Sequence, residues 1–199
     1  MAKGPKYRVR FKRHRKKRTN YYLRKRLLQS NLPRMVIRLS NKHIIIQLTE
    51  ARLEGDNIIS YTHSSELKRV FNWEAGCGSI PSAYLTGYLA GLKIGANSQI
   101  EKAILDIGFQ NASYGSRVFS ALKGLIDANI DIPHSEDIFP SEDRISGKHI
   151  ETIANTIYEY EDGRYKKQFS AYIKAKFNPR NYVNYFNEML KKIETKFNN

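Results

Sequence analysis

The sequence predicts an α/β fold with a mixed sheet of about four strands, an antiparallel hairpin plus a βαβ crossover, and helices packed on it. Three observations support this fold class. Short apolar runs of strand length alternate along the chain with apolar stripes at helical spacing. Two of these runs flank a pair of turn-forming residues, as the strands of a hairpin do. The chain of 199 residues is also long enough to bury one large core.

The N-terminal quarter of the chain holds all of its excess positive charge. Residues 1–49 contain sixteen Lys or Arg and no Asp or Glu, whereas residues 50–199 contain eighteen basic and nineteen acidic residues. The net charge of +15 therefore comes from this quarter. Residues 1–18 form a basic arm, which we expect to be disordered alone because like charges at this density repel one another. A basic arm on a nearly neutral domain favours a polyanionic partner.

Nucleic acid suits this arm better than a membrane or a targeting signal does. The arm has no apolar face, no glycine placed for myristoylation and no apolar stripe of a mitochondrial presequence. Tyr7, Val9 and Phe11 alternate with basic residues, which suits an extended segment with cations on one side and stacking groups on the other. The alternative is a solvated run of charges.

A short helix is predicted to follow the arm. Thr19 or Asn20 can cap it, and Asn31 and Pro33 end it. The side chains that we expect to face inward are Leu23, Leu27 and Tyr22. The basic side chains that we expect to project outward are Arg24, Lys25 and Arg26.

Residues 34–48 predict a β-hairpin. With Asn41 and Lys42 as a two-residue turn, where Asn tolerates the positive φ of hairpin turns, the cross-strand pairs are Leu39–Ile44, Ile37–Ile46 and Met35–Leu48. Every member of these pairs is apolar, so their face belongs to the core. The opposite face can meet water or a ligand, and its polar side chains are Arg38, Ser40, His43 and Gln47.

The sheet domain, predicted over residues 19–132, continues as a crossover. Residues 56–62 predict a third strand, and residues 102–110 predict a central fourth strand that is parallel to the third and covered on both faces. Between them Ser79 caps a helix with an apolar stripe at Leu85, Tyr88, Leu89 and Leu92. Gly87, Gly91 and Gly95 predict a close approach to the backbone of this helix, by the sheet on which it packs or, as the alternative, by RNA. A further helix is predicted to bury Val118, Phe119, Leu122 and Ile126.

Residues 133–199 predict an acidic, irregular loop and a helical C-terminal extension. The predicted apolar positions of its helices are Ile150, Ile153 and Ile157, then Tyr165, Phe169, Tyr172 and Ile173, then Tyr182, Tyr185, Phe186, Met189, Leu190 and Ile193. Asn178 and Pro179 suit the start of the last helix. We expect the extension to pack on the sheet domain or on a partner. Ten carboxylates against Arg144 and Lys148 between residues 127 and 162 predict that this part avoids nucleic acid.

The sequence contains no strong catalytic or metal-binding motif. No spacing of its five histidines closes a zinc site, and the lone Cys77 indicates a reducing compartment without a disulfide framework. Asp106 is the one catalytic candidate, because sheets of this kind can carry metal-dependent nuclease sites; the alternative is an aspartate that caps a neighbouring turn. We therefore expect a binding protein without a metal, a cofactor, a membrane or a small-molecule substrate. A nuclease that uses Asp106 is the second hypothesis.

Five stretches of the chain follow one another as in a known family, and they are TNYYLRKRLL, PRMVIRLSNKHIIIQL, IPSAYLTGYLAGLKIG, LDIGFQNASYGSRVFSALKGLIDANIDIPHS and YKKQFSAYIKAKFNP. Together they resemble the archaeal-type large ribosomal subunit protein 18 family, whose eukaryotic relative shares the C-terminal continuation. The resemblance covers essentially the whole chain. It implies a cytoplasmic protein of the large ribosomal subunit that binds 5S ribosomal RNA and attaches it in the central protuberance. It also implies contacts with the large-subunit ribosomal RNA and with neighbouring ribosomal proteins.

The resemblance implies that the arm, the first helix and the open face of the hairpin bind RNA, together with Ser79 and Arg117 at two helix starts. The implied RNA-binding residues are Lys6, Tyr7, Arg8, Arg10, Phe11, Lys12, Arg13, Arg15, Lys16, Lys17, Arg18, Tyr21, Tyr22, Arg24, Lys25, Arg26, Arg38, Ser40, His43, Gln47, Ser79 and Arg117. Lys and Arg neutralise phosphates, and the aromatic residues of the arm and first helix can stack on unpaired bases.

Overall fold

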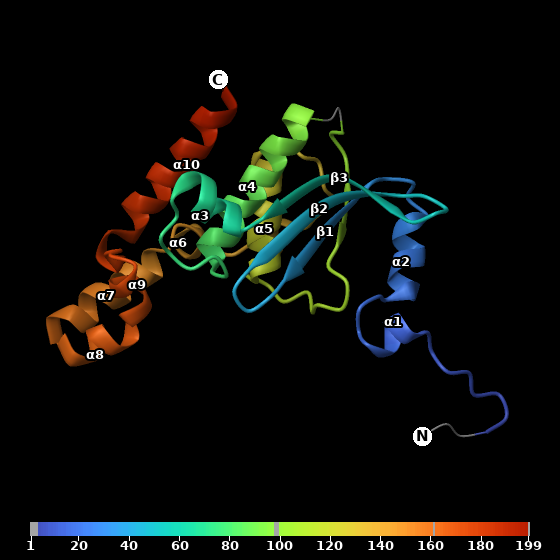
Figure 1. Cartoon of the computed structure of the whole chain (residues 1–199), viewed down its shortest axis with the longest axis horizontal. Coiled ribbons are helices and arrows are strands. Elements are labelled where there is room, and N and C mark those ends of the chain that lie inside the picture. Colours follow the sequence, from blue (N-terminus) through green and yellow to red (C-terminus); the bar gives the residue numbers. More distant parts are fainter. Residues whose placement is uncertain (1–3, 98–99, 161, 199) are drawn as a thin grey trace.

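The structure, a computed structural model of the chain, describes residues 4–97, 100–160 and 162–198. A four-stranded mixed sheet lies at its centre, with helices packed on one face (Figure 1). The strands are β1 (Arg34–Leu39), β2 (Ile44–Ala51), β3 (Asp56–His63) and β4 (Ile104–Asp106), in the order β3-β2-β1-β4. β2 is antiparallel to both β1 and β3, and β4 is parallel to β1. The predicted α/β fold with a mixed sheet is confirmed.

The β1–β2 hairpin has the predicted register. Its core-facing pairs are Leu39–Ile44, Ile37–Ile46 and Met35–Leu48. The turn differs from the prediction, because Asn41 does not adopt a positive φ. Ser40 closes the turn instead: its N–H donates to the His43 carbonyl oxygen at 2.8 Å, and its Oγ accepts from the His43 N–H at 2.9 Å.

Strand β4 is shorter and less central than predicted. It has three residues, lies at the edge of the sheet and pairs with β1 alone. The chain turns away directly after it, because Gly108 adopts a φ of +68° and donates its N–H to Asp106 Oδ1 at 2.9 Å. β4 runs in the direction of β3, as predicted, although β1 and β2 lie between them.

Helices α4 (Ile80–Asn97) and α5 (Arg117–Asp127) cover the core face of the sheet. Gly87 and Gly91 of α4, with Gly124 of α5, bring these two helices together, whereas the sequence predicts that the glycines of α4 pack on the sheet. A Cβ on Gly87 would lie 2.0 Å from the Ala121 carbonyl oxygen, and a Cβ on Gly124 would lie 2.3 Å from that of Tyr84. Gly95 has nothing within 4 Å of such a Cβ, so it takes no part in this contact.

The N-terminal helices α1 (Lys12–Arg15) and α2 (Tyr21–Leu28) lie on the side of the sheet away from α4 and α5 (Figure 1). Asn20 caps α2, since its Oδ1 accepts from the Leu23 N–H at 3.2 Å. Leu23 and Leu27 are half-buried as predicted, whereas Tyr22 is 76% exposed and does not face inward. α1 is a single helical turn within an arm that the sequence predicts to be disordered, and none of its residues is buried.

The C-terminal extension contains more short elements than predicted. They are a 3-10 turn η1 (Glu136–Ile138), α6 (Glu142–Ile145), α7 (Lys148–Tyr160), α8 (Asp162–Gln168), α9 (Ser170–Lys174), a 3-10 turn η2 (Pro179–Asn181) and α10 (Tyr182–Asn198). The predicted irregular loop therefore contains η1 and α6, and the helix predicted around Phe169 is two helices. Ile153 and Ile173, both predicted to face inward, are exposed.

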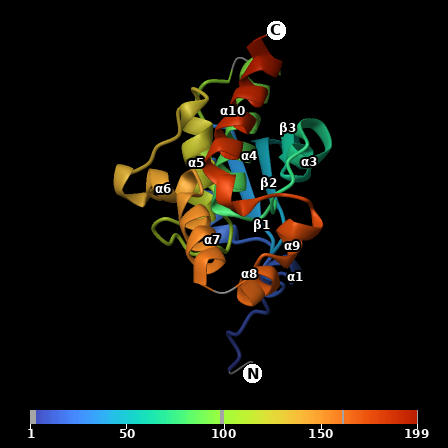
Figure 2. The same ribbon diagram turned by 90° about the vertical axis from the view of Figure 1, so that its left-hand side faces the viewer.

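A second hydrophobic cluster holds the extension to the sheet domain. Leu85 and Leu89 of α4 pack in this cluster with an apolar stripe on α10, formed by Tyr182, Phe186, Met189 and Ile193. Trp73, in the segment between α3 (Ser65–Phe71) and α4, meets the Tyr182 ring edge-on at 6.0 Å. Figure 2 shows α10 lying beside α4. The extension thus packs on the sheet domain, which is one of the two arrangements that we expected.

Candidate nucleic-acid interface

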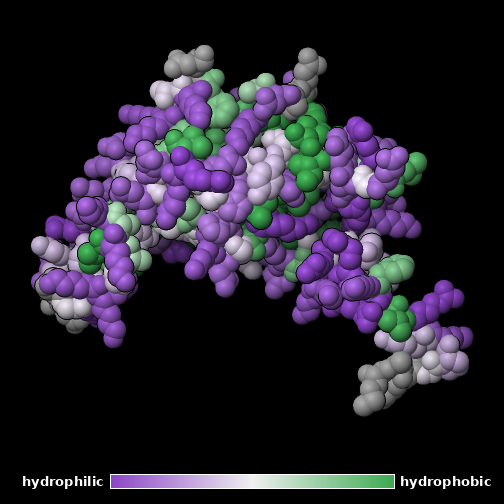
Figure 3. Space-filling view, in the orientation of Figure 1, coloured by the Kyte–Doolittle hydropathy of each residue, from purple (hydrophilic) through white to green (hydrophobic). Residues whose placement is uncertain are grey.

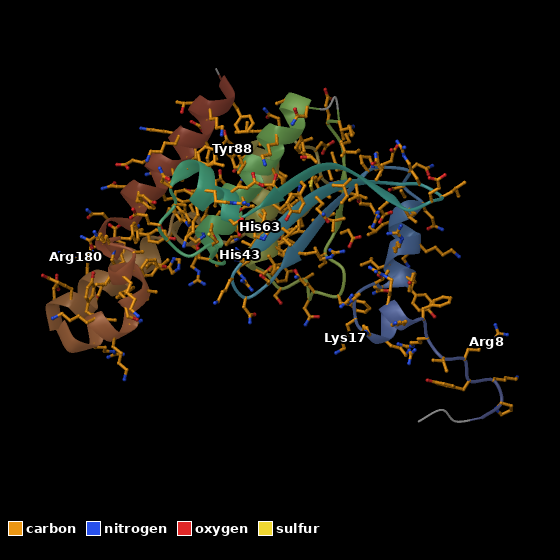
Figure 4. The ribbon with its side chains drawn as sticks, viewed as in Figure 1. Arg8, Lys17, His43, His63, Tyr88 and Arg180 are labelled. Carbon is orange, nitrogen blue, oxygen red and sulfur yellow. The ribbon has the colours of Figure 1, made fainter. Side chains whose placement is uncertain are left out.

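The basic arm and α2 form a cationic end of the molecule. Arg8 and Lys17, labelled in Figure 4, lie along the arm at a distance from the sheet. The predicted RNA-binding side chains that are exposed in this part are Lys6, Tyr7, Arg8, Arg10, Phe11, Lys12, Arg13, Arg15, Lys16, Lys17, Arg18, Tyr21, Tyr22, Lys25 and Arg26. The arm and α2 contain no Asp or Glu. Most of their positive charge is therefore exposed and has no acidic partner within these two segments.

An apolar cavity lies between the arm and α2. The rings of Phe11 and Tyr21 meet edge-to-face, with their centroids 5.4 Å apart. The cavity has a volume of about 530 Å³ and is lined by Arg8, Val9, Arg10, Phe11, His14, Tyr21, Tyr22 and Lys25. Aromatic rings next to cations are the groups that hold an unpaired nucleobase and its phosphate. The arm and α2 together thus offer more than charge.

A network of arginines and aspartates ties α2 to the sheet. Arg34 of β1, whose side chain is only 3% exposed, donates to Asp106 at 2.8 Å and to Asp56 at 2.7 Å. Arg24 of α2 donates to both carboxylate oxygens of Asp56, at 2.6 and 2.7 Å. The hydrogen bonds from Arg24 first, and from Arg34, lower the pKa of Asp56 to about 2 despite its partial burial. α2 is therefore held by a charged contact.

Two of the predicted RNA-binding arginines belong to this network. Arg24 is predicted to project outward, but it is instead held by the ion pair with Asp56. Arg38 donates to Asp106 Oδ1 at 2.9 Å and to the Asp106 carbonyl oxygen at 2.6 Å, while 37% of its side chain stays exposed. Both arginines line a cavity of about 290 Å³ between the arm and the sheet, together with Arg13, Arg18 and Arg34. Their role in RNA contact stays a prediction.

Ser40, Ser79 and Arg117 meet where the hairpin turn approaches α4 and α5. The Arg117 guanidinium donates to the Gly78 carbonyl oxygen at 2.9 Å and to that of Ser40 at 3.2 Å. Ser79 Oγ accepts from the Ser82 N–H at 3.4 Å, as the predicted helix cap. A Cβ on Gly78 would lie 2.8 Å from the Asn41 carbonyl oxygen, so a glycine is needed there. Arg117 therefore holds the junction together through two backbone carbonyls, whereas the Ser79 hydroxyl bonds within its own segment, to Gly76 and Ser82.

The open face of the sheet includes two residues that the sequence analysis missed, Tyr61 and His63 of β3. The register places Tyr61 beside Gln47 and His63 beside Ile45. His43 therefore has a neighbour on β3, and the centroids of the His43 and His63 rings are 4.8 Å apart (Figure 4). The alternation of side chains along β3 indicates that Tyr61 and His63 share one face of the strand. Which face of the sheet this is becomes known only from the pairing of β2 with β3.

Comparison with known proteins shows the family of the chain. A family model described as ribosomal large subunit proteins 60S L5, and 50S L18 matches residues 5–102 and 92–135 of the chain. Large ribosomal subunit protein uL18 of Aeropyrum pernix is 43% identical over 194 residues, which cover 98% of this chain and 90% of that protein. The chain belongs to this ribosomal protein family.

As a member of the 60S L5 and 50S L18 family, the protein is a structural constituent of the large subunit of the cytoplasmic ribosome and not an enzyme. Its partners therefore include ribosomal RNA. The family model covers the arm, α2, the sheet, α4 and α5, and the match to the Aeropyrum pernix protein takes in the helical extension as well.

The second hypothesis, a nuclease site at Asp106, is wrong for a member of this family, and the structure explains why the position carries an aspartate. The Asp106 carboxylate accepts from Arg34, from Arg38 and from the Gly108 N–H, so it caps a turn and neutralises buried charge. In the part of the chain that the structure describes, no group of three or more His, Cys, Asp or Glu could hold a metal ion. Nor is any helix there long and apolar enough to cross a membrane.

Proposed function

We propose that this ribosomal protein binds 5S ribosomal RNA, attaches it to the large subunit in the central protuberance, and also contacts the large-subunit ribosomal RNA. The observation that carries the proposal is the separation of charge, since residues 1–49 hold sixteen basic residues and no acidic one. These cations are mostly exposed on the arm and α2. The five stretches that resemble the 5S-binding family support this choice among RNA partners.

In this proposal the arm and α2 bind RNA by charge and by stacking. Each Lys or Arg that neutralises a phosphate releases counterions, which makes binding favourable and dependent on salt. Tyr7 and Tyr22 are exposed and can stack on unpaired bases, and the cavity beside Phe11 and Tyr21 can hold one. The arm becomes ordered when RNA surrounds it.

The sheet supplies shape rather than most of the charge. His43 and Gln47 lie half-buried on its open face and are offered to RNA from a rigid element. Arg24, Arg38, Ser40, Ser79 and Arg117 make hydrogen bonds within the protein, and we propose that they hold the contacting surfaces in register while their exposed atoms touch RNA.

The helical extension faces protein neighbours or solvent in this proposal. Figure 1 places its helices α7, α8 and α9 at the end of the molecule opposite the arm. Ten carboxylates lie between residues 127 and 162, from the end of α5 to the first residue of α8, and would repel RNA from that part of the chain. The proposed division into an arm (1–18), an RNA-binding sheet domain (19–132) and an extension (133–199) follows this change in charge.

The test is the affinity of the purified full-length protein for 5S ribosomal RNA against a control RNA of the same length and shuffled sequence. We expect a preference for 5S RNA of at least about ten-fold at moderate salt. The variant Lys16→Glu/Arg18→Glu should weaken binding. The matched variant Lys191→Glu/Lys192→Glu makes the same charge change on exposed residues of α10 and should weaken it much less. Equal affinity for both RNAs would refute the proposal, and equal losses in both variants would refute the assignment of the arm.

A further inference from the structure

Three rings form a row on the open face of the sheet near the hairpin turn. Tyr61 and His63 are two residues apart on β3, with ring centroids 6.4 Å apart and an angle of 21° between the ring planes. The His43 ring lies beyond His63, with their centroids 4.8 Å apart and the planes tilted by 40°. Tyr61 is 47% exposed, and both histidines are half-buried. We call these three residues the ring row.

Hydrogen bonds fix the edges of the two imidazoles, so their faces are presented in one orientation. The Ser65 N–H donates to His63 Nδ1 at 3.1 Å, and Ser65 Oγ lies 2.6 Å from the same atom. His43 Nδ1 lies 3.3 Å from Ser64 Oγ. Both serines belong to the segment that begins α3, so one short stretch of chain orients both rings.

The ring row has a hydroxyl without a protein partner. Tyr hydroxyls in a packed environment usually find a hydrogen-bond partner. Within the described ranges, no hydrogen bond reaches the Tyr61 hydroxyl, and almost half of the side chain is exposed. By contrast, Tyr84, Tyr88 and Tyr185 each bond a group of the protein. The Tyr61 hydroxyl is open to water instead, so the ring lies at the surface where a ligand can reach its face.

The surroundings of the ring row are cationic. Arg69 of α3 is exposed and donates to Ser65 Oγ at 3.0 Å, next to His63. Lys42, in the hairpin turn beside His43, is also exposed. The nearby carboxylate of Glu66 accepts from the His63 N–H at 3.0 Å and forms an ion pair with Lys93. The Glu66 carboxylate is thus neutralised within the protein, and the exposed charged groups near the rings, Lys42 and Arg69, are positive.

Burial, together with the charges of His43 and Arg69, lowers the pKa of His63, although Glu66 acts in the opposite direction. His63 is therefore uncharged near neutral pH. A neutral, flat ring beside an exposed tyrosine on a sheet is the arrangement with which RNA-binding sheets stack unpaired bases. Figure 3 shows that the molecule is hollowed below the sheet, between the arm and the C-terminal helices. A strand of RNA that follows this hollow would cross the sheet.

We propose that Tyr61, His63 and His43 form a stacking platform for one or two unpaired bases of an RNA strand. The platform is separate from the arm and α2, and it uses two residues of β3 that the charge pattern did not indicate. The inference rests on the proposed function, because it names a further contact to the same class of ligand. It gives the sheet a role in recognising single-stranded RNA.

The substitution Tyr61→Trp provides a direct test. The single native tryptophan, Trp73, is 1% exposed, so the emission added in the Tyr61→Trp variant reports the platform. Titration with 5S ribosomal RNA should quench this added emission, because a stacked base quenches indole. A fully paired RNA duplex of the same length should not quench it. No quenching by 5S RNA that is shown to be bound would overturn the platform.

Affinity provides the second measurement. Tyr61→Ala should weaken binding of 5S RNA by about ten-fold, within the range for loss of one stacked base, and Tyr61→Phe should bind like wild type. Tyr158→Ala is the matched control, because Tyr158 is 48% exposed and lies on α7 in the extension. If Tyr61→Ala does not fold, the quenching measured in the Tyr61→Trp variant decides. Wild-type protein that does not prefer 5S RNA refutes the proposed function, whereas wild-type binding that Tyr61→Ala leaves unchanged refutes the platform alone.

Discussion

Arg34 and Asp106 are 72 residues apart in the chain, yet they form a buried hydrogen-bonded ion pair with a distance of 2.8 Å between them. The pair spans the junction of β1 and β4, the parallel contact that joins the edge strand β4 to the sheet. Both side chains are almost completely buried. A charge in such a position is tolerated only when its partner is present.

Replacement of Asp106 by alanine should therefore destabilise the protein by about 3–5 kcal/mol, because Arg34 would keep a buried charge with only Asp56 to balance it. Urea-induced unfolding followed by circular dichroism measures this change. Asp131→Ala is the control, since Asp131 is exposed and its contact with Lys102 is 3.7 Å long; its effect should stay within about 0.5 kcal/mol. Similar stabilities of the two variants would contradict the role given to Asp106.

Asp56 should make stability depend on pH in the acid range. Its folded-state pKa, about 2, lies below the ordinary value of 3.8, so the folded protein favours the charged form. The resulting stabilisation, about 1–2 kcal/mol, is fully present above about pH 4 and is lost as the pH falls through 2. Wild type should thus exceed Asp56→Asn in free energy of unfolding at pH 7, and the difference should shrink between pH 4 and pH 2. In Glu54→Gln, which changes an exposed carboxylate in the loop directly before β3, the free energy of unfolding should differ little from that of wild type at every pH.

The contact between α4 and α5 predicts opposite effects for two glycines of one helix. Gly87→Ala should destabilise the protein by about 3 kcal/mol or more, because the new Cβ would overlap the Ala121 carbonyl oxygen and push the helices apart. Gly95→Ala meets open space and should stabilise by up to about 1 kcal/mol through helix propensity. Thermal unfolding of the two variants checks both signs. Destabilisation by Gly95→Ala would show that α4 packs differently.

Deletion of residues 1–18 should separate binding from stability. It removes ten Lys or Arg and no buried side chain among those described, so the melting temperature should change little. The affinity for RNA should fall, and the slope of log affinity against log salt should become shallower, by about 0.7–0.9 for each phosphate that is no longer neutralised. Part of the arm can face the large-subunit RNA, so both that RNA and 5S RNA are needed. Unchanged slopes on both would mean that the arm does not contact phosphate.

Much of the fold could be predicted because its signals are local. The six apolar residues of the hairpin determine its register, since a shift by one would place Arg38 in the core. Asn178 and Pro179, predicted to start the last helix, begin the 3-10 turn η2 directly before α10, where Asn178 Oδ1 accepts from the Arg180 N–H. The length and place of β4 could not be predicted, because they depend on the pairing with β1 and on the turn at Gly108.

The same distinction applies to the candidate site. The charge of the arm is a matter of composition, so the sequence reveals it directly. Whether a particular arginine is free depends on residues far along the chain, and Asp56 and Asp106 decide this for Arg24 and Arg38. The spacing of Gly87, Gly91 and Gly95 indicated a close contact but could not say that the contact is with α5. Tyr61 and His63 became visible only through the β2–β3 register.

The order of the strands also determines when the protein can fold during its synthesis. The hairpin of β1 and β2 leaves the exit tunnel first, but the helices that cover its apolar face end only at Asp127, and β4 comes only shortly before α5. Until about two thirds of the chain have emerged, the apolar face of the hairpin is uncovered, and the basic arm that precedes it is already outside the ribosome. Such a chain is prone to aggregate and to bind stray RNA. The sheet and the helices that cover it are completed late, and the nascent chain is most prone to aggregate before that point.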